Sequence, residues 1–165
     1  MITISEAHLS DVSAIKNVLS VTWQDTYRSF LSDSAIESVT SHWHAPQVLE
    51  NEIERDSTFV GIARSGKDVV AMITAHENED LIFVSRLYVL PSFQRRGIGI
   101  TLLSASYSAF PMAKRVKLEV EEQNLVGLAF YRKLGFAEVD RTEDDVFGIL
   151  LHSIVMEREI ERNAA

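Results

Sequence analysis

The chain has 165 residues, of which 46% are hydrophobic and 24% charged, so its length and composition fit one folded domain and exclude a disordered chain. It has no cysteine, which excludes disulfide scaffolds, thiolate zinc sites and thiol catalysis. Its 24 acidic and 16 basic residues give a formal charge of -8, which opposes nucleic-acid binding and favours cationic partners.

The N-terminal part predicts a short strand followed by a helix. Residues 1–6 read as a strand and have neither the basic nor the apolar region of a signal peptide. Val12, Ile15 and Leu19 recur at helical spacing, which predicts a helix that ends near residue 27. No stretch approaches the roughly 20 apolar residues that span a bilayer, so we expect a cytoplasmic protein without a membrane partner.

Residues 30–55 have a mixed pattern, with a break rich in serine and aspartate at 32–34 and two short helical stretches after it. This pattern predicts a flexible region that faces the substrate. His42 and His44 lie there without a third metal ligand within reach in the sequence, so we expect an exposed helix or loop and no metal site.

The rest of the chain alternates strand-like and helix-like segments, which predicts an α/β (α+β) fold with a mixed sheet and helices on both faces, in a single domain over residues 1–165. The first two strand-like runs are joined by a hairpin turn at 65–68. The predicted strands cover residues 58–64, 69–75, 81–89, 116–120, 137–140 and 146–156, and the predicted helices begin at residues 98 and 125.

The most informative segment reads LYVLPSFQRRGIG from Leu87 to Gly99, a strand that turns into a helix through two glycines. Successive N–H groups at such a helix start bind anions, and the helix dipole adds positive charge. Gly97 and Gly99 allow close approach of the main chain, and Arg95 and Arg96 can reach a phosphate. Because the third glycine of a dinucleotide fingerprint and the lysine of a P-loop are absent, the segment predicts a pyrophosphate site of another type.

Two signatures carry a resemblance to a known family. Gln94-x-x-Gly97-x-Gly99, after a strand that ends Leu-Tyr-Val-x-Pro, resembles the coenzyme A-binding motif of the GNAT superfamily of N-acetyltransferases. The second half is similar to that family's other signature, in Leu118-Glu119-Val120, Asn124, Phe130-Tyr131 and Leu134-Gly135-Phe136. The resemblance covers about residues 58–156 and implies a GNAT-like sheet of six to seven strands with a V-shaped cofactor slot.

The N-terminal Trp23-x-x-Thr26-Tyr27 is loosely similar to the PaiA-like branch of polyamine acetyltransferases. What the family resemblance implies is an acetyl-CoA cosubstrate, with the acetyl carbonyl and pantetheine arm on strand 87–89 and the pyrophosphate on the N–H groups of residues 95–99. The implied cofactor-binding residues are Leu87, Tyr88, Val89, Gln94, Arg95, Arg96, Gly97, Ile98, Gly99, Asn124 and Tyr131.

Acetyl transfer to an amine needs a neutral amine, a stabilised oxyanion and a proton for the departing thiolate. The N–H of Val89 is a candidate oxyanion donor, and Tyr131 is a candidate general acid. Many family members carry a glutamate base at the place of Phe83, so the base must lie elsewhere. Glu119 is the best substitute, although a solvated strand-end carboxylate explains it equally well. A cluster just before the third strand could instead act through water, with His76, Glu77, Glu79 and Asp80.

Aromatic side chains attract cations, so Trp23, Tyr27 and Phe30 are candidates for an amine pocket, together with Trp43. Trp23 fits the helix core equally well. We expect an enzyme that acetylates a primary amine, for example a polyamine. The alternatives are an acyl-CoA-binding sensor module and a protein N-terminal acetyltransferase. The sequence leaves open whether the protein forms a homodimer.

Overall fold

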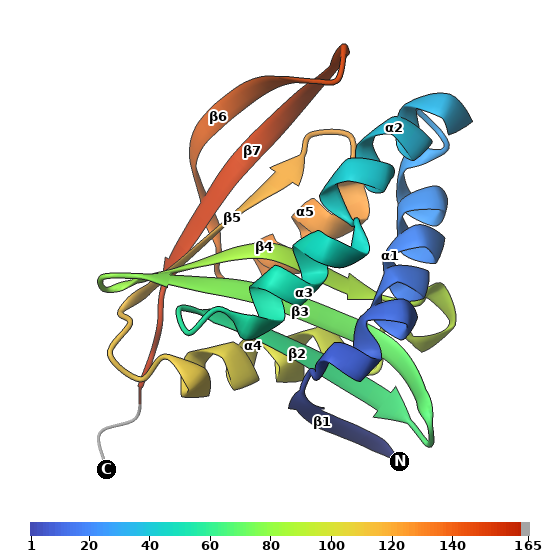
Figure 1. Cartoon of the computed structure of the whole chain (residues 1–165). Coiled ribbons are helices and arrows are strands. Elements are labelled where there is room, and N and C mark those ends of the chain that lie inside the picture. Colours follow the sequence, from blue (N-terminus) through green and yellow to red (C-terminus); the bar gives the residue numbers. More distant parts are fainter. Residues whose placement is uncertain (163–165) are drawn as a thin grey trace.

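The computed structural model describes residues 1–162, which contain one seven-stranded sheet with helices on both faces (Figure 1). The strand order is β1-β2-β3-β4-β5-β7-β6, and only the β4–β5 pair is parallel. This is the predicted mixed fold. The strands are β1 Ile2–Glu6, β2 Thr58–Ser65, β3 Asp68–Asn78, β4 Leu81–Val89, β5 Arg115–Glu121, β6 Ala137–Val146 and β7 Ile149–Glu159.

Helices α1 (Val12–Tyr27), α2 (Asp33–Trp43) and α3 (Pro46–Glu54) cover one face of the sheet, and α4 (Ile98–Ala109) and α5 (Leu125–Lys133) cover the other (Figure 1). Short 3₁₀ turns precede α1 and follow β4. Successive strand side chains point to opposite faces. On β3, Met72 therefore packs with Leu19 of α1, whereas Ile73 packs with Leu102 of α4. All four side chains are fully buried.

Strands β4 and β5 separate partway along their length. They pair only between Leu81–Val84 and residues 115–118, although β4 continues to Val89 and β5 to Glu121. On the other side of β4, the register with β3 shifts between Thr74 and Ala75, which leaves Ser85 as a bulge residue without a partner. The sheet therefore opens into a V whose apex lies at Val84 and Ser85, as the family resemblance implied.

The structure corrects the predicted extent of the last two strands. β6 runs to Val146 rather than residue 140, and β7 begins at Ile149 rather than residue 146. Phe147 and Gly148 form the turn between them with φ values of 53° and 82°. β6 lies at the edge of the sheet, most of its side chains are exposed and half of them are acidic, so the alternating apolar pattern of a half-buried strand is missing.

Residues 30–55 form α2 and α3, as the two short helical stretches predicted. Both helices bury apolar side chains, with Ile36 and Val39 on α2 and Leu49 on α3 each at most 2% exposed. This region is therefore a packed cover over one face of the sheet. No helix in the described part of the chain is long and apolar enough to cross a membrane.

Candidate active site

The N-terminus of α4 presents free main-chain donors. Gly97 caps the helix in the left-handed conformation with φ +77°, and Arg95 before it has φ +62°. The first intrahelical acceptor is the Gly97 carbonyl, which accepts from the Thr101 N–H at 3.1 Å. The N–H groups of residues 98–100 therefore have no partner within the helix, and the helix dipole places positive charge beside them. This geometry suits a phosphate.

The two glycines of the motif serve different purposes. A Cβ at Gly97 would meet open space, so this position needs glycine for its positive φ. A Cβ at Gly99 would lie 3.1 Å from the Phe130 ring, so this position needs glycine for the close packing of α5 against α4. A coenzyme A pyrophosphate fits a loop with these two properties.

Two polar side chains of the motif brace the loop itself. Gln94 donates from Nε2 to the Val89 carbonyl at 3.0 Å. Arg96 donates to the Ser92 carbonyl at 3.1 Å, and its guanidinium lies 4.9 Å from the centre of the Phe93 ring. The Arg95 side chain is exposed beside the helix start. The positive charge of Arg96 stays near the predicted phosphate position while the side chain holds the turn.

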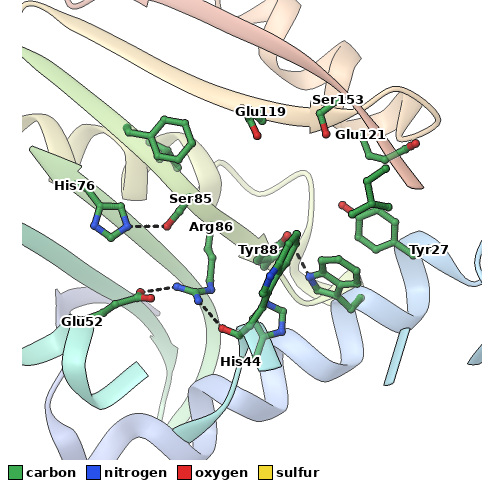
Figure 2. A pocket seen from close by; sticks show the side chains of 15 residues that line it. Tyr27, His44, Glu52, His76, Ser85, Arg86, Tyr88, Glu119, Glu121 and Ser153 are labelled. Atoms are coloured by element: carbon green, nitrogen blue, oxygen red, sulfur yellow. Dashed lines mark hydrogen bonds and ion pairs between the residues drawn. The ribbon is translucent and has the colours of Figure 1, made fainter. Parts of the chain in front are cut away.

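The main chain of β4 points donors into the V. The Leu90 N–H donates to the Val70 carbonyl on β3 at 2.9 Å. Successive peptide groups along a strand face opposite sides. The Val89 N–H therefore points away from β3, toward the opening between β4 and β5, and so does the Leu87 N–H two residues earlier. Tyr88 lies between them with its side chain directed to the face covered by α1 (Figure 2).

Helix α5 forms the other border of the cofactor side. Asn124 caps α5, because its Oδ1 accepts from the Gly127 N–H at 3.0 Å, and this leaves its Nδ2 as a donor. Tyr131 is half-buried between Phe130 and Phe136, with ring centres 5.0 Å and 5.4 Å away. Burial raises the pKa of Tyr131 above its usual range. The phenol therefore keeps its proton at neutral pH.

A cavity of about 310 Å³ lies on the opposite face, between β4, β5, β7 and helices α1–α3 (Figure 2). Its aromatic wall centres on Trp23, which is 3% exposed. The Trp23 ring centre lies 4.1 Å from that of Tyr27, with the planes tilted by 33°, and 6.0 Å from that of Trp43, which it contacts edge to face. The Trp23 Nε1 donates to the Tyr88 hydroxyl at 3.2 Å. Trp23 is thus both core and cavity wall. Phe30 packs against Tyr27 and lies outside the cavity lining.

The wall of the cavity on β5 is acidic. Figure 2 shows Glu119 and Glu121 there, with Ser153 of the paired strand β7 beside them. Glu119 is exposed and Glu121 is 8% exposed. Burial raises the pKa of both carboxyl groups, and the nearby Asp144 raises that of Glu119 further. These groups give this wall of the cavity negative charge.

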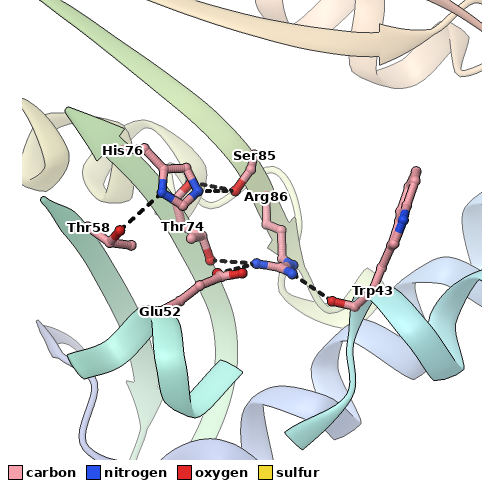
Figure 3. Close-up of polar contacts among 7 residues, drawn as sticks. All are labelled: Trp43, Glu52, Thr58, Thr74, His76, Ser85 and Arg86. Carbon is pink, nitrogen blue, oxygen red and sulfur yellow. Dashed lines mark hydrogen bonds and ion pairs between the residues drawn. The ribbon is translucent and has the colours of Figure 1, made fainter. Parts of the chain in front are cut away.

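A buried ion pair forms the opposite wall. Arg86 is 9% exposed and donates to Glu52 of α3 at 2.5 Å, to the Trp43 carbonyl at 2.7 Å and to Thr74 at 3.4 Å (Figure 3). The pair neutralises Glu52, so the charge of Arg86 and Glu52 cancels within the protein. Beside it, His76 and Ser85 also line the cavity.

The two histidines at the C-terminal end of α2, His42 within the helix and His44 at its C-cap, lie in different environments. His42 is exposed, stacks on Phe147 at 4.1 Å and contacts the Ser38 carbonyl at 2.7 Å. His44 is only 3% exposed, so the expectation that both are exposed is wrong for His44. Burial lowers the pKa of His44 to about 3, which keeps it neutral. Among residues 1–162 no three histidine, aspartate or glutamate side chains are arranged to hold a metal ion.

The sheet is split at its parallel pair, with free donors at a helix start on one side and an acidic, aromatic cavity on the other. This is the arrangement that the resemblance to the GNAT superfamily of acyltransferases implied. The model of the Acetyltransferase (GNAT) domain family matches residues 27–158. The chain therefore belongs to the GNAT acetyltransferase family, and it is an acyltransferase that uses acetyl-CoA.

Individual proteins similar to this chain are acetyltransferases as well. A spermidine N(1)-acetyltransferase of Thermoplasma acidophilum is 30% identical over 153 residues, which cover 87% of this chain and 93% of that protein. The crystal structure of the PaiA N-acetyltransferase of Thermoplasma acidophilum with coenzyme A has a TM-score of 0.86 at 26% identity, over 97% of this chain and 99% of the other. The ribosomal-protein-S18-alanine N-acetyltransferase of Escherichia coli shares the fold, with a TM-score of 0.72 at 18% identity, over 99% of this chain and 97% of the other.

Proposed function

We propose that this enzyme transfers an acetyl group from acetyl-CoA to a primary amine of a small polyamine such as spermidine. The observation that carries the proposal is the cavity that meets the apex of the V from the side opposite the helix α4 start. Aromatic rings and the two β5 carboxylates, Glu119 and Glu121, line it. Both features attract a flexible cation. The similarity to a spermidine acetyltransferase supports the same substrate class.

On the cofactor side, main-chain N–H groups of residues 95–99 hold the pyrophosphate in this proposal, with the guanidinium groups of Arg95 and Arg96 near it. The main chain of residues 87–89 and the Asn124 Nδ2 bind the pantetheine arm. When bound, acetyl-CoA supplies an activated acyl carbon on a thiol leaving group. The protein orients this carbon toward the cavity and excludes bulk water from one side of it.

Two groups then act on the reacting atoms. The Val89 N–H stabilises negative charge on the carbonyl oxygen, since it points into the V and belongs to a rigid strand. The Tyr131 hydroxyl gives a proton to the departing thiolate. A tyrosine is protonated at neutral pH and so has this proton to give, and the burial that raises the pKa of Tyr131 keeps the phenol in its acid form. The raised pKa does not make Tyr131 a stronger acid, so the role rests on its place beside the predicted cofactor side.

The acceptor side discriminates between substrate classes. A protein N-terminus would bring a single charge and a bulky chain, whereas the cavity is bordered by α1, α2 and α3 and holds about 310 Å³. A linear amine with a second cationic group can place one nitrogen at the apex of the V and the other near the β5 carboxylates. The enzyme thus favours diamines and polyamines over neutral amines.

An acceptor screen tests this proposal. Thiol release from acetyl-CoA is measured for spermidine, spermine, putrescine, a neutral primary amine of equal length and a peptide with a free N-terminus. We expect the highest kcat/KM for a polyamine. A peptide or the neutral amine as the best acceptor would refute the polyamine assignment and would leave the acetyltransferase class intact.

A further inference from the structure

Three side chains form a hydrogen-bonded chain at the edge of the cavity. The His76 Nε2 lies 3.0 Å from the Ser85 hydroxyl, and the His76 Nδ1 lies 3.1 Å from the Thr58 hydroxyl (Figure 3). The three residues come from three neighbouring strands, β3, β4 and β2. Both ring nitrogens of His76 therefore have a partner, which fixes the ring orientation.

Ser85 occupies a special place in the sheet. It is the bulge residue of β4, and it follows Val84, the last residue that pairs with β5. Its hydroxyl is thus at the apex of the V, where the cofactor side opens into the acceptor cavity. Ser85 is exposed to the cavity, whereas Thr58, at the other end of the three hydrogen-bonded side chains, is only 7% exposed. A proton taken up at Ser85 therefore has a defined route inward to the imidazole.

The relay requires one tautomer of His76, and the distances permit it. The Ser85 hydroxyl can donate to the His76 Nε2 at 3.0 Å, or to the Thr74 carbonyl at 3.5 Å, and the relay uses the first arrangement. The Nε2 is then unprotonated, and the Nδ1 carries the proton and donates to Thr58. An imidazole in this tautomer can accept a proton from Ser85.

Building on the proposed function, we propose that Ser85 and His76 form the proton relay that serves as the general base of the reaction, with Thr58 as the residue that positions His76. This relay supplies the function that the residue at 83, a phenylalanine, cannot supply. Glu119, the other candidate, follows Leu118, the β5 partner of Val84, and so borders the apex from the β5 side. It is exposed, whereas His76 is held by a hydrogen bond at each ring nitrogen.

With this relay, every proton and electron pair of the acetyl transfer is accounted for. The neutral amine nitrogen bonds to the acetyl carbon while the carbonyl electron pair moves to oxygen. The nitrogen then gives a proton to the Ser85 Oγ as the Ser85 proton moves to the His76 Nε2. The oxygen pair returns, the carbon–sulfur bond breaks with its electrons on sulfur, and Tyr131 protonates the thiolate. His76 later loses its proton to solvent, and Tyr131 regains one.

The surroundings keep His76 neutral. Burial lowers the pKa of His76, and Arg86 on β4 and Arg55 after α3 lower it further, while Glu52 on α3 raises it. The base form of a histidine is the neutral form. It therefore persists below the ordinary pKa of about 6.5, and kcat falls only when the pH drops below that value.

The kinetic test compares His76→Gln, Ser85→Ala and the conservative Ser85→Thr, with His8→Gln as a control for removal of an exposed histidine remote from the cavity. We expect kcat to fall about 10²-fold in the first two variants, near the low end for general-base catalysis. Ser85→Thr keeps a hydroxyl and should stay within about fivefold of the wild type, well short of that loss. The acid limb of the kcat profile should vanish in His76→Gln and persist in His8→Gln.

A substrate-independent measurement separates the relay from the polyamine proposal. Nitrogen NMR of the protein with coenzyme A should show the His76 Nδ1–H tautomer, and Thr58→Val should abolish that preference. Detection of the Nε2–H tautomer in the wild type overturns the relay, as does a Ser85→Ala enzyme whose kcat stays within twofold. If spermidine fails as acceptor, the same kinetics on whichever amine is acetylated test the relay while the polyamine proposal falls.

Discussion

The two sides of the V present different kinds of groups, main-chain donors on one side and side chains on the other. The cofactor side relies on main-chain groups: the N–H donors at the start of α4 and those of Leu87 and Val89 on β4. The acceptor side relies on side chains from α1, α2, α3 and four strands, with the Arg86–Glu52 pair buried among them. The main-chain donors come from one continuous stretch of about a dozen residues, with only Asn124 and Tyr131 added from α5, whereas the cavity lining is drawn from a span of more than a hundred. Local geometry is enough to form the proposed cofactor donors, whereas the cavity needs tertiary assembly.

The largest effect should come at Tyr131, on the border of the cofactor side. Tyr131→Phe removes one hydroxyl and keeps the ring packing against Phe130 and Phe136, so we expect near-normal stability and coenzyme A binding with a kcat lowered about 10²–10⁴-fold. Tyr107→Phe is the matched control, since Tyr107 is also a partly buried phenol on the main core. Steady-state kinetics that place both variants within twofold of the wild type would show that solvent protonates the thiolate.

On the cofactor side, a change in backbone conformation should weaken coenzyme A binding. Gly97→Val forces a β-branched residue into a φ of +77°, which costs about 1–3 kcal/mol if the loop keeps its shape. We expect coenzyme A affinity to fall about tenfold or more by calorimetry, in line with 1.4 kcal/mol per factor of ten. Gly66→Val is the control, because Gly66 has φ +62° in the β2–β3 turn. It should lose stability and keep its affinity. Equal affinity in a folded Gly97→Val protein would contradict the phosphate assignment.

On the acceptor side, removal of a negative charge should weaken binding of the amine substrate. Glu121→Gln keeps an oxygen for the Gln123 N–H and removes a partly desolvated negative charge, so KM for spermidine should rise about fivefold with little change in kcat. The salt dependence of kcat/KM should weaken as well. Glu6→Gln on β1 removes the same charge at the opposite edge of the sheet and should leave KM unchanged. A KM raised equally by both variants would indicate general steering by net charge.

The smallest effect should arise at the far end of α4. Arg162 donates to the Tyr107, Phe110 and Ala113 carbonyls, at distances from 2.8 to 3.3 Å, and thereby caps the C-terminus of the helix whose N-terminus faces the cofactor. Arg162→Ala should lower the free energy of unfolding by about 1–2 kcal/mol, and Tm by roughly 2–8 °C. Arg28→Ala, at an exposed position after α1, should change Tm little. A fall in kcat without a fall in Tm would contradict this structural role.

The sequence predicted the strand, turn and helix start of residues 87–99 well because their signals are local. Three adjacent signals determine this segment. Pro91 ends the strand, the glycines at 97 and 99 form the turn, and the apolar period of α4 marks the start of the helix. The main missing element was the length of β6, where exposed acidic residues replace the alternation that marks a strand.

The acceptor side was predicted less completely. The pairing of Arg86 with Glu52, 34 residues away, depends on how α3 lies over the sheet, which no local pattern encodes. One signal was present. Ser85 and Arg86 are consecutive polar residues in the otherwise apolar strand LIFVSRLYV, so each of the two faces of this strand receives one polar side chain. This pair indicates a polar site, whereas the bulge at Ser85 has no signal in the sequence. The burial of His44 has no comparable signal in the sequence.

The V also bears on how the protein avoids aggregation. Unpaired peptide groups on a strand edge can recruit the edge of another chain. The outer edges here are β1, which has five residues, and β6, whose exposed carboxylates repel a second copy. The remaining unpaired groups, on the ends of β4 and β5, face each other inside the sheet. A thin extended molecule can enter there, but a neighbouring strand, with its own side chains above and below, cannot approach as a flat partner. The unpaired peptide groups of β4 and β5 are therefore accessible to a thin ligand, such as the proposed pantetheine arm, but not to a strand of a second copy.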